Sequence, residues 1–267
     1  MKIFISSDME GTCGIVDWQE TDKGKDLYER FAAQMSREVA AACEGANAAG
    51  ADDILVKDAH DSARNIDASV LPLNARIFRG WGRHPYSMMA GLDESFDGVV
   101  FTGYHSAAEM DTNPLSHTMN LGNNYVKING ELCPELMLNS LTAAYLGVPI
   151  YALTGDKGLC DWMKARCPGT TVIPVSEGVG RAAFPSIRRW RFRASARAWR
   201  RRFPRSGRNA CSRCLSILRW KSASRSISRP RARSGIRAAS RPARARCASR
   251  RTTIWTCCGL STGFCED

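Results

Sequence analysis

The chain has 267 residues, which is enough for one large domain or two small ones with a sizeable core. Its formal net charge of +12 hides two unlike parts, because residues 1–184 carry 24 acidic and 15 basic side chains, whereas residues 185–267 carry 2 acidic and 23 basic ones. The start of the chain does not read as an export signal, and no run of about 18 apolar residues occurs. We therefore expect a soluble, cytoplasmic protein that has no membrane partner.

The first predicted strand is the apolar run at residues 3–5, and an acidic turn follows it. Asp8 and Glu10 lie two residues apart at the C-terminal end of this strand, where open α/β sheets place their ligands. Gly11 and Gly14 allow a sharp turn and a close approach of a ligand to the backbone. An Asp in such a place is often a loop or helix-capping residue. The case for Asp8 as a ligand therefore depends on the polar residues at the ends of the later strands.

The rest of the first part alternates between helices and short strands. Apolar residues at a spacing of four, ended by Gly50, predict a helix over residues 25–48. Further helices are predicted over residues 134–146 and 157–165, and further strands over residues 54–57, 75–78, 98–103, 149–153 and 171–175. Asn129-Gly130 after an apolar stretch predicts a hairpin. This order predicts an α/β fold with a mostly parallel sheet flanked by helices and a small hairpin insert.

Polar residues recur where the predicted strands end. His60 follows the second strand, His105 follows the fourth, and Glu135 opens the helix that begins at Pro134. With Asp8 and Glu10 they form a set of carboxylates and imidazoles that suits Zn²⁺, Mn²⁺ or Fe²⁺ rather than a cysteine-based structural zinc site. Five ligands are too many for one catalytic zinc ion and fit two metals about 3.5–4 Å apart. Each histidine taken alone is better explained as a structural residue, so the metal site depends on the whole set.

Five short segments make this prediction more specific: residues 8–11 (DMEG), 58–61 (DAHD), 103–105 (GYH), 116–119 (SHTM) and 133–136 (CPEL). In order and spacing they resemble the motifs of the zinc-dependent D-aminopeptidases, self-compartmentalising peptidases linked to bacterial dipeptide-transport operons. The resemblance covers about residues 1–180. It implies two zinc ions per subunit, a homo-oligomer, a catalytic histidine at His117, and the following zinc ligands: Asp8 as the bridge, Glu10, His60, His105 and Glu135.

The resemblance implies a metal-dependent aminopeptidase that hydrolyses short peptides with an N-terminal D-amino acid. Two metals would make hydroxide available near neutral pH and would polarise the scissile carbonyl. His117, on a loop outside the metal set, would act as an acid/base or electrophilic group. A different dinuclear metallohydrolase, an amidohydrolase or phosphoesterase, uses the same ligand types. Such enzymes usually show a distinct His-x-His or Asn-His pair, which is missing from this sequence.

Residues 185–267 form an Arg/Ser/Ala-rich tail of a different kind. It holds 22 arginines but one lysine, Lys221, and it scatters six cysteines and four tryptophans without a periodic apolar face. One interpretation is a basic arm that binds nucleic acid. The other, which we favour, is a segment translated out of frame from a GC-rich gene, because native basic arms also use lysine. We therefore expect a metallopeptidase catalytic domain over residues 1–184, nucleic-acid binding only if the tail is native, and an assembly that is doubtful with this tail.

Overall fold

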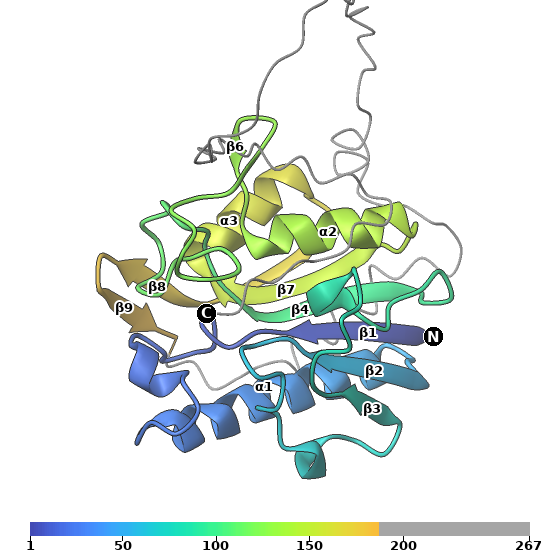
Figure 1. Ribbon diagram of the computed structural model, residues 1–267. Helices are drawn as coiled ribbons and strands as arrows, with labels where there is room; N and C mark the ends of the chain where they lie inside the picture. The colour runs from blue at the N-terminus through green and yellow to red at the C-terminus, as the bar shows by residue number, and fades with distance from the viewer. Residues whose placement is uncertain (187–267) are drawn as a thin grey trace, which may run out of the picture. The chain divides into compact units, whose positions relative to one another are not determined.

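The computed structural model describes residues 1–186 (Figure 1). Its strands are β1 (Lys2–Ser7), β2 (Asp53–Asp58), β3 (Ala75–Phe78), β4 (Gly98–Tyr104), β5 (Lys127–Ile128), β6 (Glu131–Leu132), β7 (Ile150–Asp156), β8 (Thr171–Val179) and β9 (Ala182–Pro185). Its α-helices are α1 (Tyr28–Ala48), α2 (Glu135–Tyr145) and α3 (Lys157–Arg166), and its 3-10 helices are η1 (Trp18–Glu20), η2 (Ala68–Val70) and η3 (Ser87–Met89). Every strand and α-helix predicted from the sequence is present, and β5 and β6 form the predicted antiparallel hairpin.

Seven of these strands form one sheet in the order β3-β2-β1-β4-β7-β8-β9. All neighbours pair in parallel except β8 and β9, which are antiparallel. The chain moves outward from β1 to β3 and then returns to β4 on the other side of β1. The strand order therefore reverses between β1 and β4, and open α/β sheets bind their ligands outside the carboxyl ends of the strands at this point. The predicted fold class is confirmed.

Helices cover both faces of the sheet, which explains why its central strands are buried over most of their length. Side chains alternate along β1, so Ile3 and Ile5 pack in one core layer with the apolar side of α1, whereas Phe4 packs in the other layer with residues of α2 and α3. Figure 1 shows α1 on one side of the sheet and α2 and α3 on the other. The helices pack against the faces of the sheet, so polar side chains can gather at the carboxyl ends of its strands.

Two glycines bring the acidic turn after β1 against the end of β4. The Gly11 amide donates to the Gly103 carbonyl oxygen at 2.8 Å, and the Asp8 amide donates to Thr102 O, also at 2.8 Å. A Cβ atom on Gly11 would lie only 1.9 Å from the Tyr104 carbonyl oxygen. Gly103 has a φ of +67°, and a Cβ there would lie 2.2 Å from Asp8 O. Only glycine permits this close approach of the two backbones. The approach fixes the position of Asp8 relative to β4.

Among residues 1–186, no helix is both long and apolar enough to cross a membrane. The predicted tail lies outside the described residues apart from Pro185 and Ser186. Because Pro185 is the last residue of β9, the boundary predicted after residue 184 falls inside this strand. The out-of-frame origin of the tail and its binding of nucleic acid stay predictions.

Candidate metal centre

The residues singled out in the sequence converge at the carboxyl end of the sheet. Asp8 and Glu10 follow β1, His60 follows β2, His105 follows β4, and Glu135 is the first residue of α2. All five are buried, with no more than 5% of any of them exposed. Three overlapping groups have donor atoms that lie within 4.8 Å of one another: Asp8, Glu10 and His60; Asp8, His105 and Glu135; Glu10, His105 and His117.

Asp8 lies between the two histidines at the strand ends. Its Oδ1 is 3.5 Å from Nδ1 of His60, and its Oδ2 is 3.4 Å from Nε2 of His105. Each carboxylate oxygen therefore faces a different imidazole. Asp8 can therefore contact both histidines at the same time.

Glu10 and Glu135 close the cluster on the side of His117. Glu10 contacts His60 Nδ1 at 3.1 Å through Oε2, and its Oε1 lies 3.8 Å from His117 Nε2. Glu135 Oε1 lies 3.7 Å from His105 Nε2 and 3.6 Å from His117 Nε2. The rings of His105 and His117 stack with their centroids 4.3 Å apart. His117, expected outside the ligand set, therefore lies close enough to be a donor to a cation itself.

The backbone orients all three imidazoles in the same manner. One ring nitrogen of each donates to a carbonyl oxygen: His60 Nε2 to Thr21 at 3.1 Å, His105 Nδ1 to Ser106 at 2.9 Å, and His117 Nδ1 to Leu115 at 2.9 Å. A carbonyl only accepts, so this nitrogen carries the proton. The other nitrogen is turned toward the carboxylates, as in histidines that ligate metals.

The donor atoms fit a divalent cation. Asp8 Oδ2 and His105 Nε2 are buried, and neither has a hydrogen-bond partner within the described part of the chain. An unpaired buried polar atom costs about 1–3 kcal/mol, so these two atoms, which face each other at 3.4 Å, must be paired either by a proton on Nε2 or by a cation that both ligate. Carboxylate oxygen and imidazole nitrogen are ligands that catalytic zinc prefers. The residues present thus suit this group of metals.

In Asp8, His60 and His105, burial and the neighbouring charged groups shift the pKa in opposite directions. Burial raises the pKa of Asp8, but His105 and His60 outweigh it and hold this pKa well below its ordinary value. Burial lowers the pKa of His105, whereas Asp8, Glu135 and Glu10 raise it, and the result is about 10. In His60, Glu10 and Asp8 overcome the effect of burial, and the pKa lies well above its ordinary value. Without a metal, these imidazoles therefore hold protons as counterions to the carboxylates.

The pKa values of Glu135 and His117 shift toward the neutral forms of these groups. Burial raises the pKa of Glu135 to about 7, although His105 acts to lower it. Burial and the positive charge of His105 lower the pKa of His117. A neutral imidazole at His117 can accept or donate a proton near neutral pH.

Sequence reasoning missed several residues that shape the centre. Trp18, from η1, packs edge-on against His117 with ring centroids 5.3 Å apart. The Asn113 side chain donates to the Glu10 carbonyl oxygen at 3.3 Å, and the Met119 amide donates to Glu135 Oε1 at 2.6 Å. Trp18 lies in a short 3-10 helix and the other two lie in loops, so no periodicity marks them. The one signal in the sequence is the aromatic residue close to the acidic turn.

The loop that carries His60 is fixed by the carboxylate that ends β2. Asp58 accepts hydrogen bonds from the amides of Asn65 and Ile66 at 2.6 and 2.9 Å, and from the Asn65 side chain at 2.8 Å. The Asn65 side chain also donates to the His60 carbonyl oxygen at 2.7 Å. Asp58 thus shapes the loop without belonging to any of the candidate donor groups within residues 1–186.

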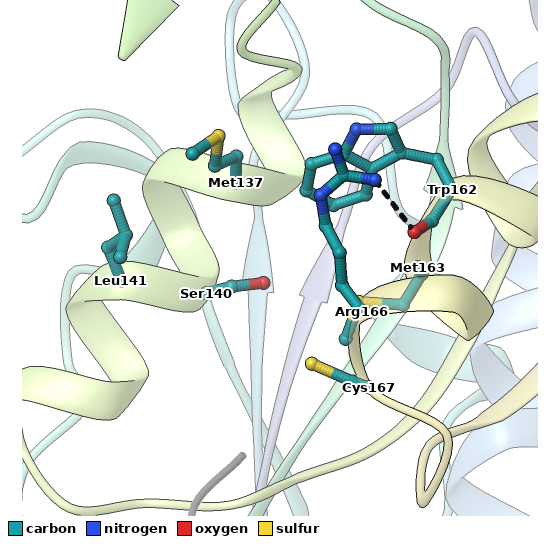
Figure 2. A pocket seen from close by; sticks show the side chains of 7 residues that line it. All are labelled: Met137, Ser140, Leu141, Trp162, Met163, Arg166 and Cys167. Carbon is teal, nitrogen blue, oxygen red and sulfur yellow. Dashed lines mark hydrogen bonds between the residues drawn. The ribbon is translucent and has the colours of Figure 1, made fainter. Parts of the chain in front are cut away.

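A hollow elsewhere in the molecule is unrelated to this centre. Figure 2 shows side chains of α2 on one side of it and side chains at the end of α3 on the other. Its described lining contains none of the candidate ligands and is mainly apolar: Met137, Ser140, Leu141, Trp162, Met163, Arg166 and Cys167. The candidate ligands among residues 1–186 therefore lie outside this hollow.

Comparison with known proteins identifies the family. The sequence profile of the D-aminopeptidases, peptidase family M55, matches residues 1–210. The chain belongs to this family. A D-aminopeptidase of Bacillus subtilis (strain 168) is 33% identical over 183 residues, which make up 68% of this chain and 66% of that protein, just under two thirds of its length. The resemblance expected from the short motifs is confirmed.

The fold of this M55 chain is also that of a solved relative. The Zn-dependent D-aminopeptidase DppA from Bacillus subtilis, described as a self-compartmentalizing protease, matches it with a TM-score of 0.70 and 31% sequence identity. The match covers 75% of this chain and 73% of that structure.

Proposed function

We propose that the chain is a zinc-dependent aminopeptidase that hydrolyses short peptides with an N-terminal D-amino acid. The observation that carries the proposal is the buried convergence of Asp8, His60 and His105 at the sheet's switch point, in a chain of the D-aminopeptidase family. The relatives named above are peptidases, and this disfavours the phosphoesterase alternative. The zinc dependence of DppA supports zinc as the metal.

Five residues would hold two zinc ions per subunit: Asp8, Glu10, His60, His105 and Glu135. Asp8 is proposed as the bridge because its two oxygens face different imidazoles. When bound, the zinc ions would supply Lewis acidity that lowers the pKa of water and polarises the scissile carbonyl. The carboxylates beside them would attract the free N-terminal amine of a peptide, which supports action at the N-terminus.

His117 is proposed as the residue that moves a proton. Leu115 O fixes its Nδ1–H, so Nε2 is the atom that accepts and donates. Its lowered pKa keeps the ring neutral near pH 7, and the edge of Trp18 limits where the ring can turn. From this place Nε2 can accept a proton from the attacking water and then give that proton to the leaving amine.

The proposal extends to the organisation of the protein. Residues 1–184 would be the catalytic domain, and residues 185–267 an out-of-frame segment that replaces the native C-terminal region. The intact protein would be a cytoplasmic homo-oligomer, since DppA is described as self-compartmentalizing. The gene sequence around codons 180–190 tests this, because a single inserted or missing base should restore an acidic, Val-containing C-terminus.

The activity is tested on the purified full-length chain loaded with zinc. We expect release of the N-terminal residue from D-alanyl dipeptides, a much slower reaction on the matched L-alanyl dipeptides, and loss of both on chelation. Bis(p-nitrophenyl) phosphate is the control substrate. Cleavage of the phosphodiester without cleavage of the D-peptides would overturn the proposal.

A further inference from the structure

We infer that Asp156 is a positioning residue that orients His105 and His117 from outside the candidate metal centre. The inference rests on the proposed function. Asp156 is the last residue of β7 and is fully buried. It belongs to none of the candidate donor groups within residues 1–186, and its two oxygens are instead occupied by donors from the loop that follows β4.

One branch of hydrogen bonds leads from Asp156 to His105. Asp156 Oδ2 accepts from the Ser106 amide at 2.7 Å, and Oδ1 accepts from Ser106 Oγ at 2.6 Å. The carbonyl oxygen of the same Ser106 accepts from His105 Nδ1 at 2.9 Å. The carboxylate therefore holds the residue whose carbonyl sets the rotation of the His105 ring and points Nε2 toward Asp8.

A second branch leads to Glu10 and His117 through Asn113. The Asn113 side-chain nitrogen donates to Asp156 Oδ2 at 3.4 Å and to the Glu10 carbonyl oxygen at 3.3 Å. The Asn113 side-chain oxygen accepts from the Leu115 amide at 2.8 Å, and Leu115 O accepts from His117 Nδ1. One buried carboxylate thus connects the backbone of a candidate ligand with the carbonyls that orient two imidazoles.

A carboxylate suits this position because the hydrogen bonds to both of its oxygens come from donors. Besides Ser106 and Asn113, the Leu159 amide in the first turn of α3 donates to Oδ1 at 2.8 Å. A carboxylate only accepts and satisfies all of these donors. An amide in its place would turn its own N–H groups toward one set of them, leaving buried donors unpaired. The substitution Asp156→Asn should therefore weaken the hydrogen bonds that hold the loop after β4, with almost no change in side-chain volume.

The test compares full-length wild type with Asp156→Asn. Zinc affinity is measured by competition with a chromophoric chelator, and hydrogen–deuterium exchange of residues 106–118 is measured on the metal-free protein. We expect zinc affinity to fall about 10- to 100-fold and exchange in this segment to rise. Ser106→Ala, which keeps the amide donor and loses the hydroxyl, should show a smaller change in the same direction.

Met163→Ala is the matched control for a general loss of stability. Met163 is buried in α3, lines the hollow in Figure 2 and takes no part in either branch. It should lower Tm while leaving zinc affinity and the exchange of residues 106–118 unchanged.

The inference is wrong if Asp156→Asn matches wild type in both measurements, or if Met163→Ala weakens zinc binding as much at an equal loss of Tm. A wild type that binds no zinc would contradict the proposed function instead. The exchange of residues 106–118 in the metal-free protein would still decide the positioning role.

Discussion

Asp8 stays ionised in a buried place because an imidazole faces each of its oxygens. Glu10 and Asp8 raise the pKa of His60, and Asp8, Glu135 and Glu10 raise that of His105, so both imidazoles hold protons in the metal-free protein. A metal ion that binds Asp8 must displace those protons, since an imidazole ligates only through a deprotonated nitrogen. The two protonated imidazoles therefore balance the negative charge of the buried carboxylates in the metal-free protein.

The three histidines differ in what their removal should do. We predict that His60→Ala and His105→Ala each reduce zinc occupancy, because each faces Asp8 through the nitrogen not held by a carbonyl. His117→Ala should keep zinc and lower kcat about 10²- to 10⁴-fold, as expected for a lost general acid or base. Metal analysis beside turnover on the three variants decides. Loss of zinc from His117→Ala, with zinc kept by the other two, would reverse the assignment.

Gly11 should be intolerant of any side chain. A Cβ there would lie 1.9 Å from the Tyr104 carbonyl oxygen, so Gly11→Ala must push the end of β1 away from β4. We predict a loss of about 1–3 kcal/mol in the free energy of unfolding, together with weaker zinc binding. Gly169→Ala is the control, since a Cβ there meets nothing within 4 Å. Equal denaturant midpoints for the two variants would contradict this prediction.

Among the helices, α1 carries an acid that the proposed chemistry does not use. Glu38 is buried, and Oε1 accepts from the Cys13 amide at 3.0 Å and from Gln34 Nε2 at 3.2 Å. Its Oε2 has no hydrogen-bond partner in residues 1–186. Burial raises the pKa of Glu38 to about 8. The folded protein therefore binds this proton more tightly than the unfolded chain does.

This raised pKa predicts a pH dependence with a definite sign. From about pH 4.5, the ordinary pKa of Glu, up to about pH 8, ionisation increasingly favours the unfolded chain, and stability falls as pH rises. The slope is about 1.4 kcal/mol per pH unit for this group, and it levels off above pH 8. We expect Glu38→Gln to flatten this decline in urea unfolding between pH 6 and 9. Glu44→Gln, on an exposed position of the same helix, should leave the profile unchanged.

Which elements can be predicted from sequence depends on how they are buried. The strands β1, β2, β4 and β7 are buried on both faces and each contains a short apolar run, so the sequence shows them without knowledge of the fold. The edge strand β9 is short and mostly exposed, and the change of composition at residue 185 hides it. The ends of buried strands predict Asp8, His60 and His105. Asn113 and Trp18 reach the centre only through contacts across the chain, which local patterns do not contain.

At the scale of the whole molecule, the centre joins residues that lie up to 127 positions apart, from Asp8 to Glu135. An unfolded chain has no such site, so metal should bind the native state alone. We predict that a chelator lowers Tm, and that free zinc at 100 times its Kd stabilises the protein by about 2.7 kcal/mol. Thermal unfolding with and without zinc measures this. His60→Ala should show a much smaller zinc-dependent shift, and an unchanged wild-type Tm would contradict a native metal site.

Asp8, His60 and His105 follow three neighbouring strands, β1, β2 and β4, and do not share one loop. Ser7 lies opposite Asp58 of β2 on one side and opposite Thr102 of β4 on the other, so any slip of β1 disperses Asp8 and the two imidazoles. Cobalt in this centre would take on its ligand-field colour only after all three strands have found their register. The absorbance of the cobalt-loaded protein would therefore report when this register forms during refolding.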